Sequence, residues 1–288
     1  MKPPPFEYHD PRSLDEALAL LAEHGEDAKV LAGGQSLVPL LNFRLARPDR
    51  LVDINGVGGL DGLRVDGGEL RLGALVRHSA LERSADAAEA VPLLRDAVQL
   101  VGHVQIRNRG TVGGSVVHAD PAAELPVALT ALGARFRVRS ARGEREIDVQ
   151  HLFVTHLTTS IEPDELLTEI VVPLPPPRTR SAFVEFARRH GDFALGGAAV
   201  LLTTDDGGRV TEASIALLAA APTPLRAPRA ERALAGRLPD EDAAREAAAL
   251  AVAEIEPTGD IHGSTEYRRG LIEAMVRRAI IAAAKDGA

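Results

Sequence analysis

A proline-rich stretch, "PLPPPRTR" at positions 173–180, is the feature that most limits how this chain can fold. Proline has no backbone N–H and a fixed φ, so such a stretch can continue neither a helix nor the interior of a sheet. We therefore expect the main domain boundary here, between residues 1–177 and 178–288. A second change in the pattern of predicted elements, at about residue 56, predicts that the first domain consists of two subdomains, 1–56 and 57–177.

The first subdomain shows the pattern of a small βαβ unit. Ser13 and Glu16 form a capping-box sequence, and the apolar spacing that follows predicts a helix over 14–24, ended by Gly25. Apolar runs predict strands at 28–32 and 49–54 on either side of a helical segment at 36–44.

The rest of the chain mixes strands and helices. In the second subdomain we expect strands at 69–75, 134–140 and 166–174, with helical stretches at 79–84 and 92–102. The run "ARFRVRS" alternates apolar and basic residues, which is typical of a half-exposed antiparallel strand. Beyond the prolines we expect strands at 183–189, 198–204 and 210–220, then helices at 227–235, 240–255 and 266–284. This order predicts an α+β fold whose C-terminal domain is an antiparallel sheet with helices.

Composition excludes several classes of partner and cofactor. The 288 residues are 45% hydrophobic with a formal net charge of −8, which supports packed cores and argues against binding to nucleic acid or anionic lipid. The chain has no cysteine, so it cannot itself ligate an iron–sulfur cluster through thiolates. No apolar run approaches the roughly 20 residues of a membrane span, and no signal peptide is evident, so we expect a cytoplasmic protein.

Two segments with paired glycines are the strongest functional signal. "KVLAGGQSLVPLL" begins at Lys29, and the same device returns in "RNRGTVGGSVVHADP". Paired glycines allow consecutive backbone N–H groups to converge on an anion, and hydroxyl or amide side chains follow each pair. One such pair is more often a plain turn, but two of matching design suggest a pyrophosphate held from two sides. Neither segment has the G-x-G-x-x-G or Walker pattern, which argues against Rossmann and P-loop sites.

Five motifs, in order, carry a resemblance that covers nearly the whole chain. They are "KVLAGGQSLVPLLNFRLARPDRLVDIN", "LRLGALVRHSALE", "QIRNRGTVGGSVVHADPAAELPVAL", "DELLTEIVVP" and "RRHGDFALGGAAV". The chain resembles the FAD-binding medium subunit of molybdenum hydroxylases, the carbon monoxide dehydrogenase and xanthine dehydrogenase flavoproteins. The resemblance implies a two-subdomain vanillyl-alcohol-oxidase (PCMH)-type FAD-binding fold, followed by a C-terminal domain of the carbon monoxide dehydrogenase flavoprotein type.

The resemblance also implies which residues contact FAD. Contacts from the two glycine segments are implied at Lys29, Val30, Ala32, Gly33, Gly34, Gln35, Ser36, Thr111, Gly113, Gly114 and Ser115. Val101 matches the position against the adenine, Ile106 is a further contact, and Val117 and Leu167 match positions beside the isoalloxazine ring, with His118 close by. Glu124 stands at the ribityl position, and Asp192 and Phe193 lie on the loop that approaches the flavin. No catalytic side chain is expected, because the flavin performs the electron transfer. No metal site is expected, because the histidines show no metal-ligand spacing with Asp or Glu.

Three positions depart from the family pattern. Ser115 replaces the usual Asn, and Glu124 is one methylene longer than the usual Asp, so the ribityl contacts can differ. Val184 stands where the xanthine dehydrogenase type has a Lys, which weighs against NAD as acceptor.

Arg107 and Arg109 beside the second glycine segment could raise the flavin's reduction potential. The alternative, which we favour slightly, is that they are solvated or pair with Glu89 or Asp120.

The leading hypothesis is an FAD subunit that accepts electrons from [2Fe–2S] clusters on a small partner subunit. A molybdopterin-bearing large subunit would oxidise the organic substrate, and the assembly would be a dimer of heterotrimers. Two alternatives stay open. One is a stand-alone flavin oxidoreductase, and the other is a non-redox module that binds a nucleotide or phosphate.

Overall fold

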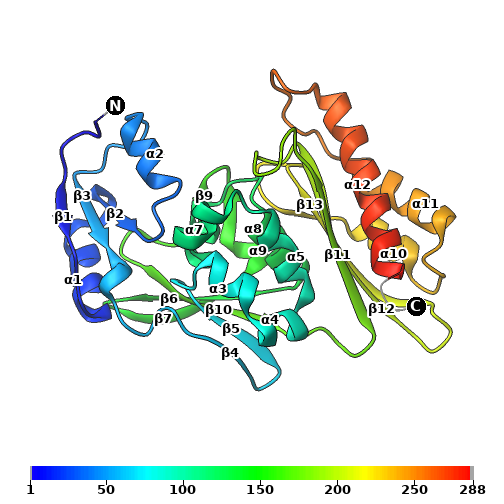
Figure 1. Ribbon diagram of the computed structural model, residues 1–288, viewed down its shortest axis with the longest axis horizontal. Helices are drawn as coiled ribbons and strands as arrows, with labels where there is room; N and C mark the ends of the chain where they lie inside the picture. The colour runs from blue at the N-terminus through cyan, green and yellow to red at the C-terminus, as the bar shows by residue number, and fades with distance from the viewer. Residues whose placement is uncertain (1, 286–288) are drawn as a thin grey trace.

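The computed structural model describes residues 2–285, which form three units, each with its own sheet and helices, arranged in a row (Figure 1). A three-stranded sheet lies at the N-terminal end, a five-stranded sheet covered by helices lies in the middle, and a four-stranded sheet with the last three helices forms the C-terminal end. The expected α+β class is confirmed. Within residues 2–285, no helix is both long and apolar enough to span a bilayer.

The N-terminal unit is the predicted βαβ arrangement with one extra strand. Its parallel sheet has the order β1–β3–β2. The elements are β1 (Glu7–His9), α1 (Leu14–His24), η1 (Gly25–Asp27), β2 (Ala28–Leu31), α2 (Leu37–Asn42), β3 (Arg50–Asp53) and η2 (Ile54–Gly56). The capping box is present, because Ser13 Oγ accepts a hydrogen bond from the Glu16 N–H at 3.2 Å and the Glu16 carboxylate accepts one from the Ser13 N–H. Strand β1 was not predicted.

The middle unit is an antiparallel sheet in the order β4–β5–β10–β6–β7. Its strands are β4 (Leu63–Asp66), β5 (Glu69–Gly73), β6 (Arg135–Ser140), β7 (Gly143–Asp148) and β10 (Leu166–Pro173), with a small β8 (Phe153–Thr155) and β9 (Thr158–Thr159) hairpin nearby. Seven helices accompany it: α3 (His78–Arg83), α4 (Ala85–Ala90), α5 (Pro92–Leu100), α6 (Val104–Arg109), α7 (Val112–His118), α8 (Glu124–Ala131) and α9 (Val149–Leu152). The second glycine pair therefore lies within α7.

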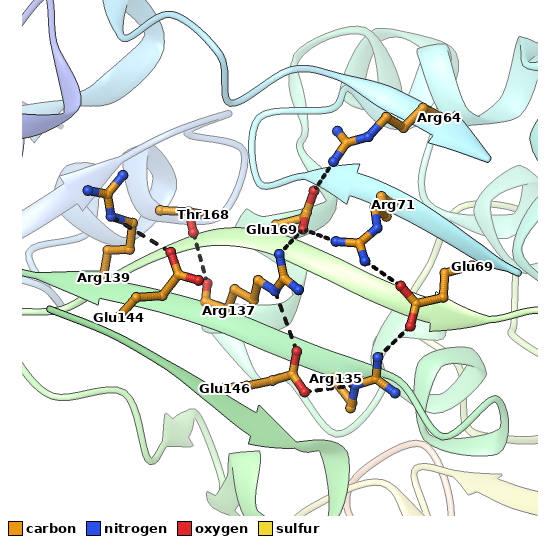
Figure 2. A network of polar contacts seen from close by, with 10 residues as sticks. All are labelled: Arg64, Glu69, Arg71, Arg135, Arg137, Arg139, Glu144, Glu146, Thr168 and Glu169. Atoms are coloured by element: carbon orange, nitrogen blue, oxygen red, sulfur yellow. Dashed lines mark hydrogen bonds and ion pairs between the residues drawn. The ribbon is translucent and has the colours of Figure 1, made fainter. Parts of the chain in front are cut away.

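An arginine–glutamate network covers the exposed face of this sheet (Figure 2). The predicted alternation of β6 is confirmed, because Phe136 and Val138 are buried while the arginines between them face outward. Glu169 on β10 is the centre of the network and accepts hydrogen bonds from Arg64, Arg71 and Arg137 at 2.9, 3.0 and 3.1 Å. The Glu169 carboxylate thus lies between three arginine side chains. Two of them, Arg64 and Arg71, are directly opposite each other in the pairing of β4 with β5.

We expect Glu169→Ala to lower the free energy of unfolding by about 2 kcal/mol, because three arginines lose their shared acceptor. The Glu169 side chain is 16% exposed, so the effect should exceed that of an exposed pair. Glu144→Ala is the control: its side chain is 51% exposed and lies 3.9 Å from Arg139, so a change within about 0.5 kcal/mol is expected. Urea unfolding measures the free energy of unfolding of the two variants. Equal decreases in the two would contradict a central role for Glu169.

The C-terminal unit is an antiparallel sheet in the order β11–β12–β13–β14. Its strands are β11 (Thr179–Phe186), β12 (Gly196–Thr204), β13 (Val210–Leu218) and β14 (Leu225–Arg226), followed by α10 (Pro228–Leu234), α11 (Glu241–Val252) and α12 (Thr265–Lys285). These helices cover one face of the sheet, and α5 and α8 lie against the other (Figure 1). The main core continues across this junction: Phe183, Leu201 and Leu218 belong to the same buried cluster as the middle unit.

Candidate functional site: a pocket beside the two glycine segments

A pocket of about 360 Å³ opens where β2 and β3 end. Because these strands are parallel, their carboxyl ends meet at one edge of the sheet, and the first glycine segment turns there into α2. The lining residues are Leu31, Ala32, Gly33, Gly34, Gln35, Val38, Pro39, Asp53, Asn55 and Arg109. Four of the predicted contacts, Ala32, Gly33, Gly34 and Gln35, are therefore brought together in one pocket.

The first glycine segment has free backbone donors. Within residues 2–285 the N–H groups of Gly33, Gly34, Gln35 and Ser36 donate no hydrogen bond, and Gln35 Nε2 donates to the Gly33 carbonyl at 3.1 Å. Gly34 has φ +72°, which favours glycine. A run of unpaired N–H groups at a chain turn is a site for an anion. The donor set therefore fits a pyrophosphate.

The second glycine segment serves another purpose than expected. Its N–H groups are already used: Gly113 donates to the Ala74 carbonyl at 3.0 Å, and Gly114 donates to Thr111 Oγ1 at 3.1 Å. A Cβ on Gly113 would lie 2.6 Å from the Ala74 carbonyl oxygen. The expectation that both pairs offer free N–H groups to phosphates is wrong for this pair, because it forms the first turn of α7, where Thr111 caps the helix.

The two glycine segments nevertheless meet. A Cβ on Gly33 would lie 2.5 Å from the Arg109 carbonyl oxygen and 2.7 Å from Gly110 Cα. A Cβ on Gly114 would lie 3.9 Å from the Ala32 side chain. Gly33 is thus required by close approach of one backbone to another, and the approach places Thr111 and α7 beside the first segment.

A polar network that sequence reasoning missed fastens this contact. Asn55 Nδ2 donates to the Ala32 carbonyl at 2.8 Å, and Asn55 Oδ1 accepts from Arg77 at 2.6 Å. Arg77 also donates to the Arg109 carbonyl, so Asn55 and Arg77 together link the two segments. The available signal was the position of Asp53 and Asn55 at the end of a strand parallel to the one that enters the first glycine pair.

Asp53 is the anionic end of this network. Its carboxylate accepts hydrogen bonds from Tyr8 Oη at 2.6 Å and from the Asn55 N–H at 2.9 Å. Burial alone would raise the pKa of Asp53, but the hydrogen bonds from Tyr8 and Asn55 outweigh it and lower the pKa below its ordinary value. The Asp53 carboxylate therefore stays charged in the pocket wall, and an anionic ligand must be placed by the N–H groups away from it.

Other predicted contacts lie on β2 and α7. Lys29 and Val30 are on β2, and Ser115, Val117 and His118 are on α7, where Val117 is 39% exposed. Burial lowers the pKa of His118, Asp120 opposes this shift, and Lys29 adds to it.

Glu124 is a buried carboxyl at the start of α8. It is 8% exposed, and burial together with the nearby Glu185 raises its pKa to about 8. Burial raises the pKa of Glu185 on β11 to about 7, and its Oε2 atom has no hydrogen-bond partner within residues 2–285. Two carboxyls that favour the protonated form can donate as well as accept hydrogen bonds, as a polyhydroxyl chain requires.

The remaining predicted contacts do not line the pocket. Val101 ends α5 and packs against the main core, and Ile106 on α6 covers Gly102. Leu167 on β10 is only 3% exposed and belongs to the main core. Asp192 and Phe193 lie in the loop between β11 and β12, where Phe193 is 71% exposed. The structure does not gather these residues at the pocket, and their contact with a cofactor stays a prediction.

The two arginines of the second segment have different surroundings. Arg107 is buried and pairs with Glu82 at 2.9 Å, so pairing with Glu89 or Asp120 is wrong for this residue. Distance along the sequence did not indicate this ion pair, because it is the packing of α3 against α6 that brings Glu82 next to Arg107. Arg109 instead lines the pocket.

Comparisons with known proteins agree with this geometry. Residues 4–175 match the family described as "FAD binding domain in molybdopterin dehydrogenase", and residues 181–283 match "CO dehydrogenase flavoprotein C-terminal domain". The 6-hydroxypseudooxynicotine dehydrogenase complex subunit alpha of Paenarthrobacter nicotinovorans is 46% identical, over 97% of this chain and 95% of that protein. The carbon monoxide dehydrogenase medium chain of Afipia carboxidovorans is 40% identical, over 97% of both chains.

Solved structures show the same fold. Quinoline 2-oxidoreductase from Pseudomonas putida superposes with a TM-score of 0.95 at 41% identity, covering 99% of both chains. Together the two family matches cover both glycine segments and α7. They also cover the whole C-terminal sheet except the first two residues of β11. This chain therefore belongs to the family of FAD-binding flavoprotein subunits of molybdopterin dehydrogenases, the oxidoreductases that include carbon monoxide dehydrogenase.

Proposed function

We propose that this chain binds FAD, with the pyrophosphate on the free N–H groups of residues 33–36, and relays electrons from a partner's [2Fe–2S] clusters to an external acceptor. The observation that carries the proposal is the run of four unpaired backbone donors at residues 33–36, three of them in residues that line the pocket. Gly33 and the hydrogen bond from Arg77 to the Arg109 carbonyl bring this run against the end of α6. When bound, FAD supplies the redox chemistry. The chain's own residues bind and orient it.

The other predicted contacts fit this orientation. With Ala32 and Gly114 side by side, a dinucleotide on the first segment would pass along α7, where Val117 is exposed and burial lowers the pKa of His118. Glu124 and Glu185, as protonated carboxyls, suit the ribityl hydroxyls, and Asp192 and Phe193 would lie toward the flavin ring. We further propose that residues 1–177 form the FAD-binding domain and residues 178–288 the C-terminal domain.

The partners are proposed from the chain's chemistry and its relatives. With no cysteine, the chain supplies no thiolate ligand for a cluster. Its relatives are named as one subunit or medium chain of dehydrogenases. We infer a small iron–sulfur subunit, a large molybdopterin subunit, a dimer of heterotrimers and a cytoplasmic location. Relatives are named for substrates as different as carbon monoxide and 6-hydroxypseudooxynicotine, so the organic substrate follows from the large subunit.

An absorbance spectrum of the purified protein tests the cofactor, and heat release with chromatography identifies it. Flavin bands and released FAD at about one per chain are expected. A colourless chain that also fails to bind added FAD would favour a non-redox phosphate-binding module. A flavin-loaded chain that turns over an organic substrate without partner subunits would favour a stand-alone oxidoreductase.

A further inference from the structure

The loop at residues 187–195, between β11 and β12, is fixed firmly at its base. The Leu195 N–H donates to the Phe186 carbonyl at 2.8 Å, which closes the loop. Arg268 at the start of α12 is 7% exposed and donates to the Leu195 carbonyl at 3.3 Å. Within the loop, Asp192 N–H donates to the Arg189 carbonyl at 3.1 Å. Asp192 and Phe193 are therefore carried on a compact turn.

The tip of this loop rests on His103, which belongs to the middle unit. Gly191 has φ +84°, and a Cβ placed on it would lie 2.4 Å from His103 Cε1 and 2.6 Å from Nδ1. The neighbouring His190 ring has its centroid 6.3 Å from that of His103. The backbone of the loop is thus in direct contact with an imidazole across the junction between the two units.

The support beneath His103 is rigid. His103 is the N-cap residue of α6, and the segment before it is held by Arg107, which donates to the carbonyls of Val101 and Gly102 at 3.1 and 3.3 Å. Arg107 is buried and anchored by Glu82. One continuous set of contacts therefore links Val101, a predicted adenine contact, to Asp192 and Phe193, the predicted flavin contacts.

We propose that His103 is a positioning residue for the loop 187–195, setting where Asp192 and Phe193 stand over the cofactor by seating Gly191 on its imidazole ring. The cofactor side of this proposal rests on the proposed function. Phe193 is 71% exposed, so its position depends on how the loop is held rather than on burial of its own ring. Arg268 fixes one end of the loop, and His103 fixes the tip.

The test uses His103→Ala, Gly191→Ala and the double variant. Hydrogen exchange of a peptide covering 187–195 reports the loop in the flavin-free protein, and visible circular dichroism reports the flavin environment in the loaded protein. Each single variant is expected to raise exchange in the loop about tenfold, which corresponds to about 1.4 kcal/mol of opening free energy. His103→Ala removes the contact, whereas Gly191→Ala forces a methyl group against the ring. In the double variant the methyl group introduced at position 191 meets no ring, so its exchange should not exceed that of the worse single variant.

Gly236→Ala is the matched control. Gly236 has φ +76°, close to that of Gly191, but nothing lies within 4 Å of its Cβ position. It carries the same backbone strain without the collision, so loop exchange and flavin dichroism should stay unchanged. Strictly additive effects of His103→Ala and Gly191→Ala, or unchanged loop exchange in His103→Ala, would overturn the contact as a support.

The two readouts separate this inference from the proposed function. If the loop loosens in His103→Ala while the flavin dichroism stays that of the wild type, the loop does not stand over the cofactor and the positioning role fails. If the wild-type chain binds no FAD, the proposed function fails, while hydrogen exchange still decides whether His103 holds the loop. Support for the proposal requires the loosened loop and an altered flavin spectrum together.

Discussion

Gly33→Ala is expected to weaken FAD binding by about 5- to 150-fold, because a misfit that costs about 1–3 kcal/mol acts directly on the pocket. The added Cβ would lie 2.5 Å from the Arg109 carbonyl oxygen and 2.7 Å from Gly110 Cα. Both obstacles are backbone, so neither can rotate away. The first glycine segment must move off α6, and its free N–H groups leave the position that the Asn55 and Arg77 bonds give them.

The measurement is the dissociation constant for FAD, from flavin fluorescence, together with the melting temperature of the flavin-free protein. Gly58→Ala is the control, because nothing lies within 4 Å of a Cβ on Gly58 and its φ is not in the left-handed region. Wild-type affinity in Gly33→Ala would show that the two segments can separate without loss of the cofactor. It would also remove the main support for placing the pyrophosphate on residues 33–36.

Much of the fold could be predicted from local pattern. The first helix, 14–24, was predicted correctly at both ends because a capping box and a terminal glycine are written in neighbouring residues. The helical connection between β2 and β3 was also predicted correctly. Strands β4 and β7 were missed, because "LRVD" and "GEREID" are short and polar, and only pairing with β5 and β6 makes them strands. Their stability comes from tertiary contacts that a single segment does not encode.

Of the candidate site, only the part formed by the first glycine segment could be predicted from the sequence. Paired glycines indicate close backbone approach, but not what is approached: Gly33 meets Arg109, while Gly113 meets Ala74. Local sequence indicates only the Asp53–Asn55 end of the polar network, because Arg77 lies 22 residues beyond Asn55 in the chain. The salt bridge of Arg107 with Glu82 was unpredictable for the same reason.

Glu124 and Glu185 predict an unusual pH dependence. Burial is the main cause of both raised pKa values, about 8 for Glu124 and about 7 for Glu185, and Asp120 adds to the shift at Glu124. Because these values lie above those of the unfolded chain, the folded chain holds more protons. The stability they contribute is complete below about pH 4.5 and is lost as the pH rises through 7 and 8.

Glu124→Gln should therefore stabilise the flavin-free protein at pH 9 by on the order of 3 kcal/mol, and leave it nearly unchanged at pH 5. Glutamine keeps the size of the protonated acid but cannot ionise, so the cost of burying a charge disappears. Urea unfolding of wild type and variant between pH 5 and 9 measures the difference. Glu165→Gln provides the opposite sign: hydrogen bonds from Arg145 lower the pKa of Glu165, so its loss should destabilise the protein at pH 7 and above. Parallel pH profiles for wild type and Glu124→Gln would mean that the Glu124 carboxylate reaches solvent, and that in the proposed ribityl contact it could act as an acceptor only.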